Sequence, residues 1–356
     1  MSKIIKLPGL IDPHVHLRDP GQTYKEDFYT GTSAALAGGY TTILDMPNNL
    51  APVTTLGRLE NKIKIAKEKI LCDVGFHFGS LGDNLDEFEK ISEKVIGLKL
   101  YLSQTTGGFI IPKKKAEAVF RRWPKNKVIL VHAENKMLDY IIKLVSVFKN
   151  KVYICHVGRK DEIIKIRKAK DDGLAITFGT TPHYLFLTNK DFKKNGPFAF
   201  MKPPLGSKKD QDFLWKNIRF VDVIESDHAP HTIEEKESNR PPFGVPGLET
   251  TLPLLLTAAA KGRITIEQIV EKCYENPAKI FNIKTNEKTH SEVDLNQEYV
   301  IENKNLKTKC GWSPFAGWKV KGKVKRVFIR GKKVYEGEKV LLKPGSGKIL
   351  QPIKES

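Results

Sequence analysis

The chain has 356 residues, and its 60 lysines and arginines against 41 aspartates and glutamates give a formal net charge of +19. A hydrophobic content of 40 % with 9 % aromatics excludes a disordered or fibrous protein. No apolar stretch approaches the roughly 20 residues of a membrane span, and Pro8 and Gly9 interrupt the first apolar residues too early for a signal peptide. We therefore expect a soluble cytoplasmic protein.

The positive charge is spread along the chain, with lysine-rich stretches at 62–69 and 113–115. No RNA- or DNA-binding motif accompanies these stretches, so we expect neither a nucleic-acid nor a membrane partner. The charge indicates either a solvated lysine-rich surface or a field that attracts small anionic substrates. The four cysteines are far apart and form no CxxC pair, which excludes a zinc ribbon and a disulfide framework.

Short apolar runs alternate with longer amphipathic segments along the first two thirds of the chain. The expected strands cover residues 10–17, 40–46, 72–79, 95–102, 128–132, 152–157, 174–178 and 220–226. The expected helices cover residues 26–37, 56–69, 85–94, 114–123, 137–148 and 160–171. This alternation predicts parallel βαβ units, and eight strands predict a closed (β/α)8 barrel of the TIM type. A doubly wound open sheet is the competing fold, but no glycine-rich phosphate loop follows the first strand.

The pattern changes after two further expected helices at 248–261 and 265–274. Residues 292–301 and 320–340 are strand-like, and they predict a small β appendage that Ile4 and Ile5 could complete. The expected units are a barrel domain over 7–283, a small β subdomain made of 1–6 plus 284–345, and a loosely held tail over 346–356.

Functional side chains alternate at the end of the first expected strand. His14, His16 and Arg18 are two residues apart, so they share a face that points into the barrel mouth. Two imidazoles at this spacing can bind one zinc-sized ion, although an HxH pair alone is weak evidence. Lys99 on the fourth strand also faces inward, where an unpaired ammonium is costly. Either an interior carboxylate pairs with Lys99, or its neutral amine adds CO2 and the carbamate bridges two metals.

Three more candidate ligands lie at the ends of later strands: His132 on the fifth, His156 on the sixth and Asp227 on the eighth. Each histidine alone could be structural, but barrel active sites lie at the C-terminal strand ends. Nitrogen and carboxylate ligands without a thiolate suit zinc or a similar divalent ion. The set predicts a two-metal hydrolytic site.

Several segments, taken together and in this order, carry a resemblance. LPGLIDPHVHLRDPG, GLKLYL, HAEN, ICHVGRK and SDHAPHTIEEK resemble the type-I dihydroorotases of the amidohydrolase superfamily, over residues 7 to about 340. The resemblance implies a cyclic amide hydrolase that reversibly converts N-carbamoyl-L-aspartate to L-dihydroorotate plus water in pyrimidine (UMP) biosynthesis. It also implies two zinc ions that are bridged by a carboxylated lysine and a hydroxide.

The same resemblance assigns roles to the candidate ligands. His14, His16 and Asp227 match the ligands of one metal, and His132 and His156 match those of the other. The lysine that would bridge the two metals is Lys99. The bridging hydroxide would be the nucleophile, and Asp227 would be the general acid and base.

Five residues match substrate contacts of the family, three to the ring carboxylate and two, through their backbone, to the ring amide. They are Arg18, Asn48 and His231 for the carboxylate, and Pro246 and Gly247 for the amide. An arginine offers a rigid bidentate fork for a carboxylate. A salt bridge for Arg18, a turn position for Asn48 and a local backbone contact for His231 are the alternatives.

Four further positions concern either the closure of the site over the substrate or a difference between this chain and the family. Thr105 and Thr106 match a lid over the substrate, and a plain surface turn is the alternative. Gly179 stands where many relatives have a glutamate, linked in some to an extra metal, so we expect no third ion. Lys202 replaces a more usual asparagine or arginine, which could alter the rim near the substrate.

Two other functions compete with this interpretation. A dihydropyrimidinase, hydantoinase or allantoinase would share the metal ligands, but its substrate has no ring carboxylate for Arg18 and Asn48 to bind. An inactive barrel kept as a scaffold for aspartate transcarbamoylase would have lost metal ligands, whereas this chain has all six. The expected partner is the small-molecule substrate. Association with a transcarbamoylase and with further copies of the chain is left open.

Overall fold

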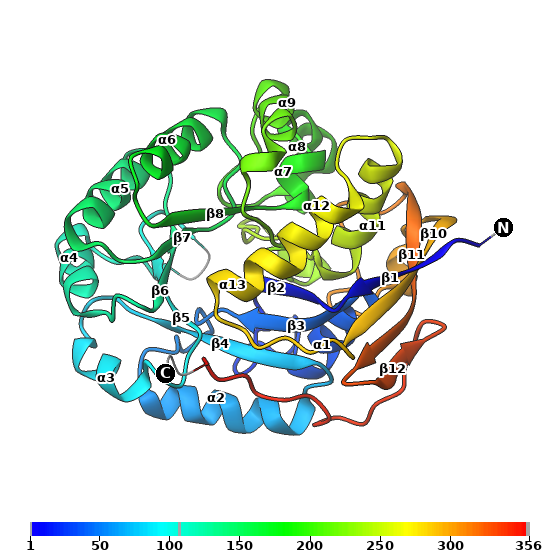
Figure 1. Cartoon of the computed structure of the whole chain (residues 1–356), viewed down its shortest axis with the longest axis horizontal. Coiled ribbons are helices and arrows are strands. Elements are labelled where there is room, and N and C mark those ends of the chain that lie inside the picture. Colours follow the sequence, from blue (N-terminus) through cyan, green and yellow to red (C-terminus); the bar gives the residue numbers. More distant parts are fainter. Residues whose placement is uncertain (1, 106–107, 354–356) are drawn as a thin grey trace.

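The computed structural model describes residues 2–105 and 108–353. Eight parallel strands form a ring in which each strand pairs with the next along the chain (Figure 1). An isolated parallel bridge joins Val15 to His228, and the His16 amide donates to the His228 carbonyl over 2.8 Å, which closes the ring. The predicted (β/α)8 barrel is therefore confirmed. Its strands are β2 (Leu10–Val15), β3 (Tyr40–Asp45), β4 (Asp73–Gly79), β5 (Gly97–Tyr101), β6 (Val128–His132), β7 (Val152–Ile154), β8 (Ile176–Thr180) and β9 (Val223–Ile224).

Helices follow the strands and cover the outside of the ring (Figure 1). In α5, Leu138, Ile141, Leu144 and Val145 are buried at three- and four-residue spacing, as expected for a helix with one face on a sheet. No described helix is both long enough and apolar enough to cross a membrane. The helices are α1 (Phe28–Ala37), α2 (Leu56–Lys69), α3 (Phe88–Ile91), α4 (Lys113–Arg122), α5 (Lys136–Phe148), α6 (Lys160–Asp171), α7 (Pro182–Phe186), α8 (Asn189–Asn195), α9 (Lys208–Lys216), α10 (Ile233–Lys236), α11 (Leu248–Ala260), α12 (Ile266–Val270) and α13 (Asn276–Ile280).

The strands are buried on both faces, as strands inside a layer of helices must be. In β6, Ile129 and Val131 belong to the large core shared with the helices, whereas Val128 and Leu130 belong to a second cluster that includes Tyr153. Such alternation packs one set of side chains outward and the other into the ring. The barrel interior is thus a packed core that supports the polar groups at the strand ends.

The segment between β8 and β9 contains α7, α8 and α9, which the sequence analysis did not predict. These helices are five to nine residues long, too short for a clear apolar period. The chain nevertheless carries start signals for two of them. Thr188 with Asp191 and Ser207 with Asp210 form capping boxes at the first residues of α8 and α9.

A five-stranded antiparallel sheet lies beside the barrel (Figure 1), which confirms the predicted β appendage. Its order is β1-β10-β11-β12-β13, and the N-terminal strand pairs with β10 from Ile4 opposite Asp294 to Pro8 opposite His290. The strands are β1 (Ile4–Pro8), β10 (His290–Val300), β11 (Lys319–Ile329), β12 (Lys332–Glu336) and β13 (Lys339–Val340). The division of the chain into domains stays a prediction.

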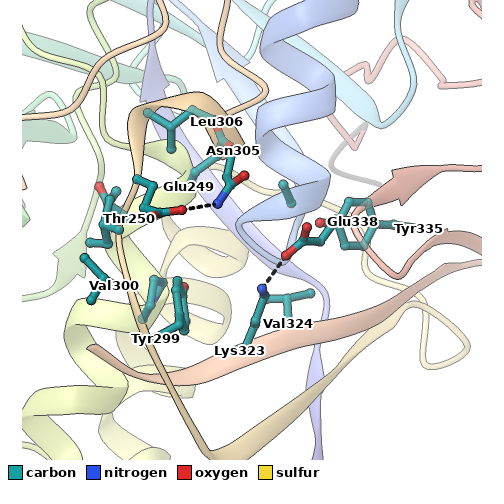
Figure 2. A pocket seen from close by; sticks show the side chains of 14 residues that line it. Glu249, Thr250, Tyr299, Val300, Asn305, Leu306, Lys323, Val324, Tyr335 and Glu338 are labelled. Carbon is teal, nitrogen blue, oxygen red and sulfur yellow. Dashed lines mark hydrogen bonds and ion pairs between the residues drawn. The ribbon is translucent and has the colours of Figure 1, made fainter. Parts of the chain in front are cut away.

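A hollow with about 640 Å³ of empty space lies where this sheet meets α11 (Figure 2). Glu249 of α11, Tyr299 of β10 and Lys323 of β11 are among its lining residues, and Lys323 forms an ion pair with Glu338. Both Glu249 carboxylate oxygens accept hydrogen bonds from the Lys307 amide, over 2.8 and 2.9 Å. The hollow is therefore part of the joint between sheet and barrel.

The C-terminal segment is hydrogen-bonded to the barrel at its described residues 347–350, where the sequence analysis expected a loosely held tail. The Val74 amide donates to the Lys348 carbonyl over 2.9 Å, and the Leu350 amide donates back to the Val74 carbonyl over 2.8 Å. These backbone groups are available because β4 pairs with β5 only from His77 onward. The tail thus extends the sheet where two barrel strands diverge, which no local sequence pattern indicates.

Candidate metal centre and substrate pocket

The six side chains predicted as metal ligands come together at the C-terminal ends of the barrel strands. All six residues are buried, and the most exposed, His16 and Asp227, reach only 7 %. They are His14 in β2 and His16 just after it, Lys99 in β5, His132 at the end of β6, His156 after β7 and Asp227 after β9.

His14, His16 and Asp227 form the first ligand group. The Nε2 atoms of both histidines lie 3.3 Å from Asp227 Oδ1, and one donor atom from each residue lies within 4.8 Å of the others. His16 Nδ1 lies 2.7 Å from Asn48 Oδ1, so Nδ1 carries the proton and leaves the Nε2 lone pair facing Asp227. This arrangement fits a divalent cation.

His132 and His156 form the second group, with His132 Nδ1 only 3.0 Å from His156 Nε2. The ring centroids of His156 and His14 are 5.2 Å apart, so the two groups are neighbours. Burial lowers the pKa of all four imidazoles, and the nearby Lys99 charge lowers each pKa further. The rings are therefore neutral near pH 7, which is the form that binds metals.

Lys99 is fully buried beside these imidazoles. Its Nζ donates to Cys155 Sγ over 3.0 Å and lies 4.8 Å from the Tyr101 ring centroid. In the described part of the chain, no carboxylate forms an ion pair with Lys99. An ammonium in such a place lacks the compensation that a buried charge requires. Conversion of the Lys99 amine to a carbamate would replace this cation by oxygen ligands. The surroundings of Lys99 therefore fit a residue that bridges two metal ions.

Three site residues have a left-handed backbone, with φ of 62° at Arg18, 40° at His156 and 46° at Asp227. Residues other than glycine seldom adopt this conformation, and it costs about 1–3 kcal/mol at each position. It persists where the surroundings determine it, and such residues concentrate at functional sites. Three of the eight non-glycine residues with positive φ in the described part of the chain thus lie in the candidate site.

Glu225 is a buried carboxylate at this site that the sequence analysis missed. It accepts hydrogen bonds from the His156 amide over 2.6 Å and the Tyr153 hydroxyl over 2.8 Å, and it lies 3.4 Å from His14 Nδ1. Burial raises the pKa of Glu225 to about 8. A carboxylate behind a metal-binding histidine fixes the ring orientation. Its place at the end of the eighth expected strand, close to Asp227, was a readable signal, because barrel active sites lie at the C-terminal strand ends.

Glu225 and Tyr153 also account for the glycine at position 179. A Cβ atom at Gly179 would overlap the Tyr153 hydroxyl oxygen and lie 2.9 Å from the Glu225 carboxyl group. A further group with metal-ligand spacing consists of His14, His156 and Cys155. Burial raises the pKa of the Cys155 thiol to about 12, so the protonated thiol is a poor ligand. The expected absence of a third ion stays a prediction.

Glu26, also missed by the sequence analysis, links the segment between β10 and β11 to the site. This fully buried carboxylate accepts hydrogen bonds from the Thr308 hydroxyl and from the Lys309 amide, the latter over 3.1 Å. It also lies 3.2 Å from His228 Nε2, and His228 Nδ1 accepts a hydrogen bond from the Gly247 amide over 3.2 Å. The chain of contacts therefore fixes His228, the residue next to Asp227.

The metal-ligand histidines and Asp227 open onto a hollow with about 370 Å³ of empty space, which Arg18, Asn48, Thr105 and Lys202 also line. His231, Pro246 and Gly247 are not among its lining residues. Pro246 and Gly247 instead line a neighbouring smaller hollow. Thr106, the other predicted lid residue, lies outside the described residues.

Arg18 keeps part of its guanidinium available to a ligand. Its Nε donates to the Pro230 carbonyl over 3.2 Å, and its Nη2 lies 3.1 Å from His231 Nε2. His231 Nε2 also lies 2.9 Å from the Phe243 carbonyl oxygen, while His231 Nδ1 lies 3.3 Å from Lys25 Nζ and 3.5 Å from Glu235 Oε2, so either ring nitrogen can carry the proton. Nη1 and Nη2 of Arg18 carry two hydrogens each, so guanidinium donors remain for an anion in the hollow whichever tautomer His231 adopts.

Comparisons with known proteins first define the class. Residues 5–105 match the model of the amidohydrolase family. The structure of an L-hydantoinase (dihydropyrimidinase) from Arthrobacter aurescens superposes with a TM-score of 0.92 at 25 % identity, covering 98 % of this chain and 89 % of that one. An inactive dihydroorotase-like domain of a Chaetomium thermophilum CAD-like protein gives 0.84 at 26 % identity, covering 98 % and 99 %. The fold is that of an amidohydrolase barrel.

Sequence relatives then narrow the family. The dihydroorotase of Pyrococcus furiosus is 38 % identical over 372 residues, which cover 98 % of this chain and 86 % of that protein. The multifunctional protein CAD of Squalus acanthias is 45 % identical over 347 residues, which cover 97 % of this chain but 16 % of CAD. The chain thus spans about one sixth of the length of that relative. It belongs to the dihydroorotase family.

Proposed function

We propose that this chain is a dihydroorotase that interconverts N-carbamoyl-L-aspartate and L-dihydroorotate in pyrimidine biosynthesis. The observation that carries the proposal is that Arg18, with an unused guanidinium donor, shares one hollow with four imidazoles and Asp227. Metal ligands alone suit many hydrolases, but a buried arginine beside them suits a substrate that carries a carboxylate. The names of the relatives support the same reaction.

The donor set suits two zinc ions. His14, His16 and Asp227 would hold one ion, His132 and His156 the other, and a carboxylated Lys99 with a hydroxide would bridge them. Two such ions supply Lewis acidity at an amide carbonyl and an activated water at neutral pH. Within the chain, Asn48 and Glu225 support this set by orienting His16 and His14.

The substrate would be oriented by groups at the rim of the hollow. Arg18 would bind the ring carboxylate through the guanidinium edge that Pro230 leaves free. Asn48 and His231 would contribute to the same carboxylate, and the backbone of Pro246 and Gly247 would hold the ring amide once the substrate is bound. Thr105 would contact the substrate from the lid side.

Asp227 would move the proton. Burial raises the pKa of its carboxyl group, while His183 and Lys99 oppose the increase. A carboxylate whose pKa lies nearer neutrality is a better general base. As water forms a bond to the ring amide carbon, Asp227 accepts the proton that water releases, and it delivers that proton to the ring nitrogen as the C–N bond breaks. The reverse sequence closes the ring and releases water.

Further parts of the proposal concern the setting of the enzyme. The CAD relative is named as a multifunctional protein, which supports association of this chain with other pyrimidine enzymes, aspartate transcarbamoylase among them. Self-association and a cytoplasmic location complete the proposal.

The test measures zinc per chain together with ring opening of dihydroorotate, with hydantoin and dihydrouracil as control substrates. We expect about two zinc ions per chain and turnover of dihydroorotate alone. Turnover of the controls at similar rates would identify a broader cyclic amidase, because neither control carries the carboxylate that Arg18 would bind. Zinc-loaded protein that is inert toward all three would indicate an inactive scaffold.

A further inference from the structure

Lys202 is a half-buried cation in the hollow that holds the catalytic groups. It lines this hollow together with Arg18, Asn48 and Asp227, and its ammonium lies 5.4 Å from the Phe243 ring centroid. Within residues 2–105 and 108–353, no carboxylate forms an ion pair with Lys202. A cation that faces a hollow without an internal counter-charge is available to an anionic ligand.

The backbone around Lys202 is held in place, although its side chain is long and flexible. The Tyr184 hydroxyl donates to the Pro203 carbonyl over 2.7 Å, and the Gly244 amide donates to the Phe200 carbonyl over 3.0 Å. The first bond ties the segment to α7, and the second ties it to the loop that carries Phe243. The ammonium can therefore adjust its position while its attachment point stays fixed.

The two ligands of the proposed reaction differ in charge. Dihydroorotate carries one carboxylate, whereas N-carbamoyl-L-aspartate carries two, because ring closure consumes the second. Arg18 has one edge occupied by the Pro230 carbonyl and offers the other to one carboxylate. The open-chain ligand thus brings one more negative charge into a hollow where Lys202 is a second protein cation.

We propose that Lys202 is a specificity-determining residue that favours binding of the dianionic open-chain ligand over that of the monoanionic ring. This inference rests on the proposed function. The Coulomb attraction between Lys202 and a ligand grows with the charge of the ligand. Tyr101 and Phe243 line the hollow, and their side chains screen this attraction less than water does. Lys202 acts on binding and takes no part in proton transfer.

The test compares KM values in the two directions for Lys202→Gln and the wild type. We expect KM for N-carbamoyl-L-aspartate to rise about tenfold and KM for dihydroorotate to rise about twofold. The two increases differ because Lys202→Gln removes a charge-assisted contact that contributes more to the binding of the dianion. Because the reaction's equilibrium constant is fixed, kcat/KM must fall by one common factor in both directions, which checks the data internally.

Two variants serve as controls. Lys202→Arg keeps the charge and should keep the wild-type ratio of the two KM values. Lys194→Gln removes an exposed lysine of α8 and should change neither KM. Three results would overturn the inference: equal changes of the two KM values in Lys202→Gln, no change of either KM value in Lys202→Gln, or the same KM changes in Lys202→Arg as in Lys202→Gln. In each case, turnover by the wild type would still uphold the proposed function. A wild type without turnover would overturn both.

Discussion

Replacement of Arg18 by lysine separates substrate binding from metal binding. Arg18 is buried, its Nε is bonded to the Pro230 carbonyl, and its Nη1 and Nη2 keep hydrogens that can bind an anion beside the contact of Nη2 with His231. Lysine has one nitrogen, so it cannot keep the Pro230 contact and also present a planar fork to a carboxylate. Loss of about 2 kcal/mol of charge-assisted hydrogen bonding corresponds to a rise of roughly 30-fold in KM for dihydroorotate.

The assay measures initial rates of dihydroorotate ring opening and zinc per chain on the same samples. We expect the zinc content of Arg18→Lys to equal that of the wild type, because no predicted ligand changes. Arg121→Lys is the matched control, since Arg121 is 72 % exposed on α4 and lies outside the hollow. An unchanged KM, or a loss of zinc in proportion to the loss of affinity, would refute the assigned contact.

Three further changes test other parts of the account. Asp227→Asn should lower kcat by at least about a hundredfold, because it removes the proposed proton carrier, while circular dichroism shows a folded protein. Burial raises the pKa of Glu162 from 4.5 to about 7, so this carboxyl destabilises the fold as pH rises through that window. Glu162→Gln should therefore raise the free energy of unfolding in urea by about 1–2 kcal/mol at pH 8, with no gain at pH 4. Gly179→Ala should lower the free energy of unfolding by about 1–3 kcal/mol, because the new methyl group overlaps the Tyr153 hydroxyl.

Each of these expectations has a contrary outcome. Near-normal turnover of Asp227→Asn would remove Asp227 from the proton-transfer step. A Glu162→Gln protein less stable than the wild type at pH 8 would mean that the carboxylate has a favourable partner in solution. Wild-type stability of Gly179→Ala would mean that Tyr153 moves aside without cost.

The barrel could be predicted because each strand is a short buried run between amphipathic helices with one apolar face, as in β6 and α5. Boundaries were less accurate where pairing decides them. The eighth strand was expected over residues 220–226, but β9 covers only Val223–Ile224, because β8 pairs with it over these two residues alone. The pairing of the tail with Val74 depends on where β4 and β5 diverge, which is a property of the folded sheet.

Residues of the candidate site could be predicted where they alternate along an expected strand or lie at its C-terminal end. His14 and His16 carry such a signal, and so does Glu225 at the end of the eighth expected strand. Glu26 carries none, because its partners Thr308 and Lys309 are 282 and 283 positions away and reach it only after the segment between β10 and β11 has packed on the barrel. Contacts of this kind arise from tertiary structure, so a single sequence does not indicate them.

The pair of zinc ions joined through Lys99 is the central claim, and anomalous diffraction at the zinc absorption edge from crystals of the zinc-loaded protein tests it most directly. We predict two peaks, one beside His14, His16 and Asp227 and one beside His132 and His156, with a carboxylated Lys99 between them. A single peak, or an unmodified Lys99 that contacts neither ion, would contradict the account.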